Sequence, residues 1–266
     1  MNPSDFTTCA YCPRLCRHVC PVAVGTGFES ATPSSMMAVP LLAARGALDA
    51  ADALVGTSLC LGCGACTAHC KVHVPVSKRL TAWRDVEAPA PEPLAAVVGT
   101  ALHVCILTDD RDWSASWAAV AARAVSVLRT RDSLGHASWK RGNPNVLAAV
   151  TAHLAGRELV TGSGAVEQVA VAAGLRVHRL PTPPSATVFH TCHAGPRPGP
   201  SQLACCGRRE GFGAREPDAA RAVALENVRL LGDVSTTCAD DECACWLREH
   251  GARIVGPTDS FGSFDD

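Results

Sequence analysis

The residues with the clearest chemistry in this chain are its 15 cysteines, which are grouped rather than scattered. The segment Cys9–Cys20 holds four with the spacing C-x2-C-x3-C-x3-C-P, and Cys60–Cys70 holds four with the spacing C-x2-C-x2-C-x3-C. Cys105 stands alone, and six more lie in Cys192–Cys245. An odd count cannot pair fully in disulfides within one chain, and spacing this close is typical of metal or redox sites.

The spacing in the first two groups suits a cubane 4Fe–4S cluster, which needs four thiolates around a compact core. A tight turn with three close cysteines reaches three corners, and in two-cluster ferredoxins the last cysteine of the opposite motif supplies the fourth. Gly62 and Gly64 relieve crowding where backbone N–H groups approach the sulfurs. The pattern predicts two clusters, one on Cys9, Cys12, Cys16 and Cys70 and the other on Cys60, Cys63, Cys66 and Cys20.

Zinc is the alternative metal for these motifs, because paired C-x2-C sequences also build sites of four thiolates. A three-cysteine turn with a distant fourth cysteine, present twice and followed once by Pro21, is more specific for iron and sulfur. A zinc-binding interaction module is therefore the less favoured hypothesis.

Composition limits the partners that the chain could have. Its 24 Lys and Arg residues against 25 Asp and Glu residues leave no basic excess for a phosphate backbone, which argues against a nucleic-acid binder. The start of the sequence shows no signal-peptide pattern, and the longest apolar run, over 94–107, is shorter than the ~20 residues of a membrane span. We expect a cytoplasmic protein, with any association with a membrane made through a partner.

Hydrophobic periodicity predicts an α+β chain, with an all-helical N-terminal part and an alternating C-terminal part. Helices are expected over 34–56 and 81–86, and the Pro-rich stretch 88–93 predicts a domain boundary near residue 90. Beyond it, strands are expected at 101–107, 157–161, 175–180, 186–190, 233–237 and 252–255, and helices at 113–129, 145–154, 165–173, 218–231 and 240–250. Such alternation is typical of α/β units on a mainly parallel sheet.

An internal repeat is predicted within the second part. The sequence LAGRELVT at 154–161 matches LLGDVSTT at 230–237, and each is followed by a predicted helix that ends at a glycine, Gly174 or Gly251. The first copy has Gly162 where the second has Cys238. We therefore expect a helical domain over 1–90 and an α/β domain over 91–266. Within the latter, the copy 91–184 lacks the clustered cysteines, and the copy 185–266 carries them.

The C-terminal cysteines predict a further metal site. Cys238 lies at a predicted strand-to-helix turn, where the N–H groups of a helix N-terminus favour thiolates. The adjacent Cys205 and Cys206 point in different directions and could contact different irons of one cluster. The alternative is a set of buried thiols, because cysteine is among the most buried residue types.

The pattern Cys192, Cys205-Cys206-Gly207, Cys238 resembles the cysteine-rich CCG domain of heterodisulfide reductase B and D subunits, and the segment Cys9–Cys70 resembles their C subunit. The order of the two parts in one chain, the ferredoxin-like part first and the CCG domain second, resembles that of heterodisulfide reductase D-like proteins. It also resembles the iron–sulfur subunits of glycolate oxidase, lactate oxidation complexes and anaerobic glycerol-3-phosphate dehydrogenase. The resemblance implies a third 4Fe–4S cluster, non-cubane in heterodisulfide reductase, with the ligands Cys192, Cys205, Cys206, Cys238 and Cys243. Between Cys243 and Cys245 we favour Cys243, although the spacing departs from the family's C-x-x-C.

The resemblance implies an iron–sulfur electron-transfer protein that relays electrons through two 4Fe–4S clusters toward the CCG-site cluster in an oxidoreductase complex. The implied partner is a flavoprotein dehydrogenase or a quinone-linked, membrane-bound redox subunit. The alternative is a thiol/disulfide reductase that acts at the CCG cluster. Because only one copy carries the clustered cysteines, a mechanism that needs two CCG clusters is not expected.

Overall fold

The computed structural model of the chain describes residues 4–13, 16–84, 103–107, 126–129, 134, 136, 139, 143, 145–180, 188–189, 191, 202–208 and 212–257. The chain divides into two compact units. The first comprises Met1–Glu87, His190–Asp233 and Trp246–Ala252, and the second comprises Ala88–Phe189, Val234–Cys245 and Arg253–Asp266. The first division falls close to the predicted boundary near residue 90, whereas the residues that follow 190 contribute to both units.

Among its described residues, the first unit contains helices, turns and loops but no strand. Its α-helices are α1 (Ser4–Ala10), α2 (Pro21–Thr26), α3 (Pro33–Ala44), α4 (Ala50–Ser58), α5 (Ala65–His69), α6 (Val76–Arg84), α11 (Phe212–Arg215) and α12 (Pro217–Leu231), with 3-10 turns η1 (Arg17–Val19) and η2 (Glu29–Ala31). The single helix expected over 34–56 is wrong, because the chain forms α3 and α4 instead. Gly46 turns the chain with a φ of 71°, and the Asp49 carboxylate then accepts the Asp52 N–H at 2.8 Å and begins α4.

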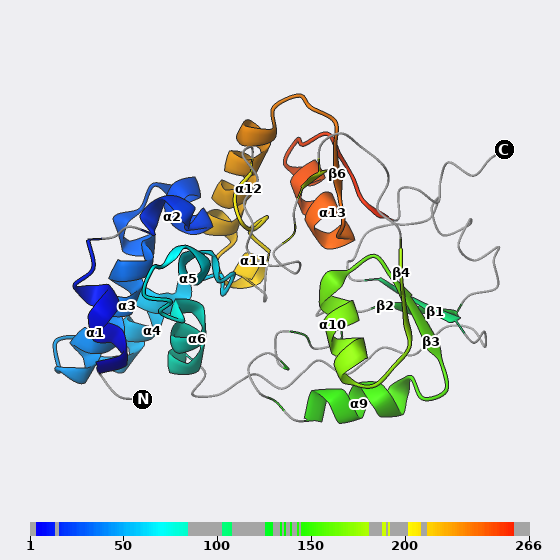
Figure 1. The fold of residues 1–266 in the computed structure, drawn as a ribbon, viewed down its shortest axis with the longest axis horizontal. Helices are drawn as coiled ribbons and strands as arrows, with labels where there is room; N and C mark the ends of the chain where they lie inside the picture. The colour runs from blue at the N-terminus through cyan, green and yellow to red at the C-terminus, as the bar shows by residue number, and fades with distance from the viewer. Residues whose placement is uncertain are drawn as a thin grey trace. The chain divides into compact units, whose positions relative to one another are not determined.

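Helix α12 packs against α2 within the first unit (Figure 1). The two backbones touch at Gly25, where a Cβ atom would lie 2.9 Å from the Cα of Val223. Val22 and Ala220 are buried beside this contact. Residues far apart in the sequence therefore share one hydrophobic core, which includes Cys20, Val22, Leu61, Leu203, Cys205, Phe212 and Val223.

The turn that carries Cys205 and Cys206 is fastened to α12 by a fully buried side chain, Asn227. Its amide oxygen accepts the Leu203 N–H at 2.8 Å, and its amide nitrogen donates to the Cys205 carbonyl at 3.0 Å. Trp246 donates its indole N–H to the Cys206 carbonyl, also at 3.0 Å. Because buried polar groups are costly to leave without a partner, these bonds hold the turn in one conformation.

Gly207, which follows the two cysteines, is expected to tolerate no side chain. Its φ is 104°, and a Cβ atom would lie 2.7 Å from the Ala220 carbonyl oxygen. The substitution Gly207→Ala should lower the free energy of unfolding by about 3 kcal/mol, from backbone strain and the clash together. The control is Gly232→Ala, because Gly232 has a φ of 59° but open space around its Cβ position. Equal losses for both variants, measured by circular dichroism during denaturation, would contradict the role of the clash.

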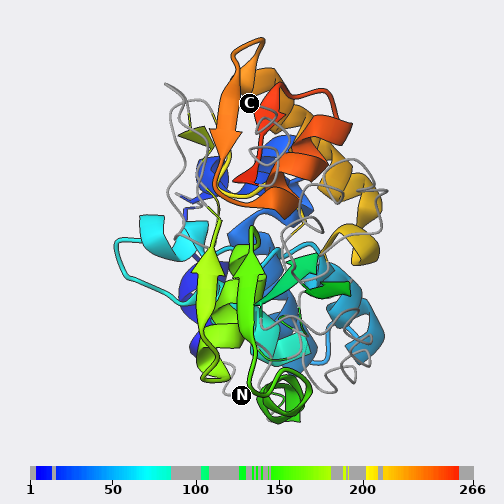
Figure 2. The same ribbon diagram turned by 90° about the vertical axis from the view of Figure 1, so that its right-hand side faces the viewer.

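The second unit contains two small parallel sheets. The first has the strand order β2-β1-β3-β4, with β1 (His103–Leu107), β2 (Ser126–Arg129), β3 (Glu158–Thr161) and β4 (Val177–Arg179). The second has the order β5-β6-β7, with β5 (Val188–Phe189), β6 (Thr236–Cys238) and β7 (Ile254–Val255). The helices of this unit are α9 (Asn145–His153) and α10 (Gly164–Ala172), and α13 (Asp241–Glu249) belongs to it as far as Cys245. Figure 2 shows β3 and β4 side by side in one direction, as their parallel pairing requires. A helix-rich chain with parallel sheets confirms the predicted α+β class.

One predicted element of this unit is wrong. Residues 126–129, expected as the end of a helix over 113–129, form strand β2, in which Ser126 pairs with Val104 and Arg129 pairs with Leu107. Hydrogen bonding along β1 outweighs the helical periodicity of this short segment. The rest of that predicted helix lies outside the described residues, as does the predicted linker 88–93.

Candidate metal centre

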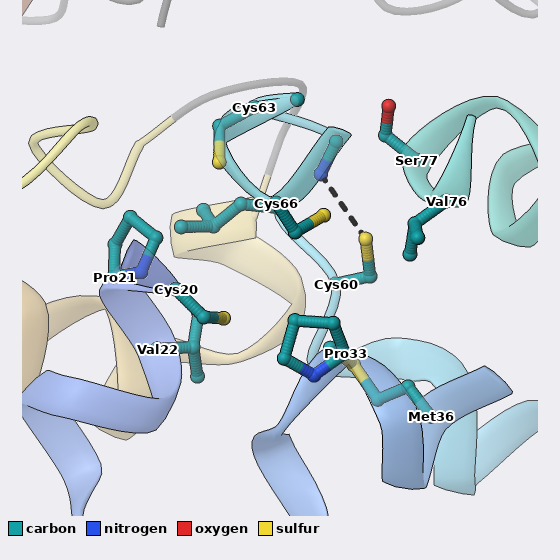
Figure 3. A pocket seen from close by; sticks show the side chains of 13 residues that line it. Cys20, Pro21, Val22, Pro33, Met36, Cys60, Cys63, Cys66, Val76 and Ser77 are labelled. Atoms are coloured by element: carbon teal, nitrogen blue, oxygen red, sulfur yellow. Dashed lines mark hydrogen bonds between the residues drawn. The ribbon is translucent and has the colours of Figure 1, made fainter. Parts of the chain in front are cut away.

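Four cysteines from two distant motifs line one cavity in the first unit (Figure 3). Cys20 lies directly before α2, Cys60 and Cys63 lie in the loop before α5, and Cys66 lies in α5. The rest of the wall is mainly apolar, with Pro21, Val22, Pro33, Met36, Leu61 and Val76. Four thiols around a largely apolar cavity are a donor set that fits a 4Fe–4S cluster.

The loop around these thiols depends on two glycines. Gly62 and Gly64 have φ values of 70° and 76°, which L residues with side chains rarely adopt. With this geometry the Gly62 N–H donates to the Cys60 sulfur at 3.4 Å, and α5 begins directly after Gly64. The expected relief of crowding therefore has a specific conformational basis.

Burial raises the pKa of every thiol at this cavity for which a shift is resolved. Burial raises the pKa of Cys20 to about 11, although the N–H groups at the start of α2 partly oppose it. Burial also raises the pKa of Cys63 and of Cys66, and in each case neighbouring thiols, Cys60 and Cys20 among them, raise the pKa further. Without a metal these thiols stay protonated at neutral pH, so the binding of iron must displace protons.

The other four N-terminal cysteines form a second set. Burial raises the pKa of Cys9 to about 11, and the nearby thiols of Cys16, Cys70 and Cys12 raise it further, whereas Arg79 lowers it. Cys16 and Cys70 pack against the hydrophobic cluster that contains Cys9, although 60 residues lie between Cys9 and Cys70 in the sequence. Cys16 also contributes to the raised pKa of Cys20 and of Cys66, so the two sets of thiols adjoin each other.

Among the described side chains, no group of three or more His, Cys, Asp or Glu is arranged to hold one metal ion.

Arg84 is a site residue that the sequence did not indicate. From the last turn of α6 it donates to three backbone carbonyls, those of Thr57, Ser58 and Cys60, at 3.3, 3.4 and 3.0 Å. These bonds fix the path of the chain as it enters the second cysteine motif. The one signal that could have found it is a basic residue near the end of the predicted helix 81–86, where such side chains often bond backbone carbonyls.

The C-terminal cysteines are divided between the two units. Cys205 and Cys206 are buried in the first unit, where Gly207 donates its N–H to the Cys205 sulfur at 3.5 Å, as Gly62 does to Cys60. Cys238, Cys243 and Cys245 are buried in the second unit, and Cys192 lies outside the described residues. No disulfide joins the eight N-terminal cysteines or the described C-terminal ones, Cys205, Cys206, Cys238, Cys243 and Cys245.

Comparison with known protein families decides the chemistry of the N-terminal motifs. Residues 5–74, which contain both motifs, match the family model described as the 4Fe-4S dicluster domain. The chain is an iron–sulfur protein. The match favours 4Fe–4S clusters over zinc at the N-terminal cysteines of this iron–sulfur protein. The thiol donors at the cavity fit such a cluster.

No curated protein and no solved structure matches this iron–sulfur protein. Within the part of the chain that the structure describes, no helix is both long enough and apolar enough to cross a membrane.

Proposed function

We propose that this iron–sulfur protein is the electron-transfer subunit of an oxidoreductase complex. In this proposal Cys9, Cys12, Cys16 and Cys70 hold one 4Fe–4S cluster, Cys20, Cys60, Cys63 and Cys66 hold a second, and the CCG cysteines hold a third. A bound 4Fe–4S cluster supplies one-electron redox chemistry at a potential tuned by its surroundings. The observation that carries the proposal is the meeting of Cys20 with Cys60, Cys63 and Cys66 at one cavity.

The packing of the first unit supports an order among these sites. Cys60 and Cys66 of the second set lie in one buried hydrophobic cluster with Cys9 of the first. Cys20 in turn lies in the same hydrophobic core as Cys205 of the CCG turn. The residues of the second set therefore stand between the first set and the CCG turn, which suits a relay.

The topology of the second unit supports two related copies in the α/β part. In one sheet α10 connects the parallel neighbours β3 and β4, and in the other α13 connects the parallel neighbours β6 and β7. Gly174 and Gly251 follow the two helices with φ values of 76° and 104°. The copy 91–184 would then serve as a scaffold for the copy 185–266, which brings the clustered cysteines.

We propose a flavoprotein dehydrogenase or a quinone-linked, membrane-bound redox subunit as the partner of this chain. The fused order of the two cysteine-rich parts supports this partner through the resemblance to subunits of such complexes. Since the partner would supply the substrate site, the relay is expected to show no turnover by itself.

The substitution Cys205→Ser tests the third cluster. Anaerobically purified wild-type chain should contain about twelve iron atoms and the variant about eight, since one 4Fe–4S cluster is lost. EPR spectra of the reduced variant should keep the signals of the two N-terminal clusters. The matched control is Cys105→Ser, which changes the isolated cysteine in β1 and should leave all signals in place. About eight iron atoms in the wild type would refute the third cluster, and stoichiometric zinc would refute the whole proposal.

A thiol/disulfide reductase at the CCG site is the second candidate function, favoured by the neighbouring thiols of Cys205 and Cys206. Reduction of small disulfides by the isolated, chemically reduced chain separates the two functions. Turnover that disappears in Cys205→Ser supports the reductase, and the absence of turnover without a partner supports the relay.

A further inference from the structure

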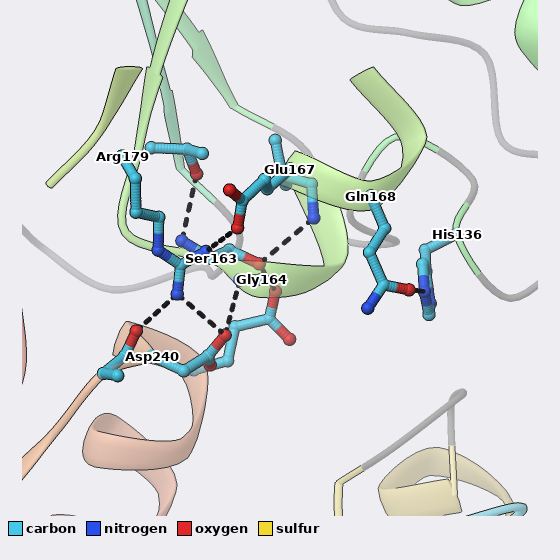
Figure 4. Close-up of polar contacts among 11 residues, drawn as sticks. His136, Ser163, Gly164, Glu167, Gln168, Arg179 and Asp240 are labelled. Atoms are coloured by element: carbon cyan, nitrogen blue, oxygen red, sulfur yellow. Dashed lines mark hydrogen bonds and ion pairs between the residues drawn. The ribbon is translucent and has the colours of Figure 1, made fainter. Parts of the chain in front are cut away.

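A single carboxylate joins two helix N-termini in the second unit (Figure 4). Asp240 is fully buried. Its Oδ1 accepts the Cys243 N–H at 3.1 Å in the first turn of α13, and its Oδ2 accepts the Gly164 N–H at 2.6 Å at the start of α10. Asp240 therefore caps its own helix and the helix of the other predicted copy at once.

The opposite turn makes the reciprocal contact. Ser163 caps α10 by accepting the Val166 N–H at 3.4 Å, and its hydroxyl donates to the Glu242 carboxylate in α13 at 2.7 Å. The two strand-to-helix turns thus hold each other through their capping residues. A helix N-terminus carries partial positive charge, so a carboxylate between two of them is well compensated.

Arg179, which ends β4, completes this contact. Its guanidinium lies 3.8 Å from Asp240 Oδ2, donates to the Ala239 carbonyl, and pairs with Glu167 at 3.2 Å. The backbone just before Asp240 and the Glu242 side chain just after it are therefore held by groups from the copy that lacks the clustered cysteines.

We propose that Asp240 is a positioning residue that fixes the turn between Cys238 and Cys243 for metal binding. Cys238 ends β6, and Cys243 lies in the first turn of α13, so Asp240 stands between two buried thiols. Its bonds remove the freedom of this turn before any metal binds, which lowers the entropy cost of presenting both sulfurs together. The inference rests on the proposed third cluster. In it, the copy 91–184 stabilises the conformation of the cysteine-bearing turn in the copy 185–266.

The hydrogen-bonding pattern requires a carboxylate rather than an amide. Both oxygens of Asp240 face N–H donors, and one of them also faces the Arg179 guanidinium. An asparagine of the same shape would turn an NH2 group toward one of these donors and leave that donor without an acceptor. The substitution Asp240→Asn therefore changes the polarity of the contact with little change in volume.

Two measurements on the full-length chain test the inference. Asp240→Asn should lose the EPR signal of the third cluster and lower the iron content from about twelve to about eight atoms, with both N-terminal signals unchanged. Hydrogen–deuterium exchange should speed up by about tenfold at the Gly164 or the Cys243 amide, whichever then faces the asparagine NH2 group, because that amide loses its acceptor. Glu167→Gln is the matched control, since Glu167 pairs with the same Arg179 from a side chain that is 43 % exposed.

A second variant keeps the test decisive if Asp240→Asn does not fold. Arg179→Gln retains the carboxylate and its two amide donors, and it should give a partial loss of the third signal. If either variant folds and keeps the third cluster at full occupancy with an unchanged signal, the inference is overturned. A wild-type chain without a third cluster would instead overturn the proposed function, and the positioning role with it.

Discussion

Cys20→Ser is expected to remove the cluster of the second cysteine motif, and Cys70→Ser the cluster of the first. Each variant should lose about four iron atoms, because a serine oxygen is a poor substitute for a soft thiolate ligand of iron. Each motif is expected to supply its last cysteine to the cluster of the other motif, and the reason is spatial. Cys20 lines the cavity of Cys60, Cys63 and Cys66, whereas Cys70 lies close enough to Cys9 to raise its pKa.

Two reference variants identify which cluster has been lost. Cys12→Ser lies in the first motif and Cys63→Ser in the second, so their EPR spectra define the loss of each cluster. The spectrum of Cys20→Ser should match that of Cys63→Ser, and the spectrum of Cys70→Ser should match that of Cys12→Ser. If Cys20→Ser instead matched Cys12→Ser, and Cys70→Ser matched Cys63→Ser, each motif would hold its own cluster. The assignment of Cys20 and Cys70 to the cluster of the other motif would then be wrong.

Cys243→Ser is expected to abolish the proposed third cluster, whereas Cys245→Ser should leave it intact. The two residues are two positions apart on α13, which turns the side chains about 200° from each other around the helix. We therefore expect only one of them to share a site with Cys238. Cys243 lies in the first turn of α13, where helix N–H groups favour a thiolate, and its own N–H is bonded to Asp240.

Because both thiols are buried, each variant is the control for the other against a general effect on folding. Iron analysis should give about eight atoms for Cys243→Ser and about twelve for Cys245→Ser. Reversed iron contents would make Cys245 the ligand and would also remove the reason to expect an effect of Asp240 on the metal site.

Local spacing explains how much could be predicted before the structure. The 4Fe–4S chemistry of the N-terminal motifs depends on cysteines within a few residues of one another, and the family match over residues 5–74 confirms that chemistry. The α+β class follows from periodicities of similarly short range. The same reasoning failed at 34–56 and at 126–129, where a turn at Gly46 and pairing with β1 outweigh local pattern.

The sequence by itself determined the 4Fe–4S chemistry of the N-terminal motifs, because a thiol's chemistry and its spacing from the next thiol are local properties. Only the tertiary structure decided the contacts that cysteine spacing does not indicate: Cys20 and Cys205 in one core, α12 with Gly25, and Asp240 with the start of α10. Such contacts depend on the packing of whole helices and on buried hydrogen bonds between separate segments. Local periodicity in the sequence does not predict these contacts, because each joins segments more than 30 residues apart.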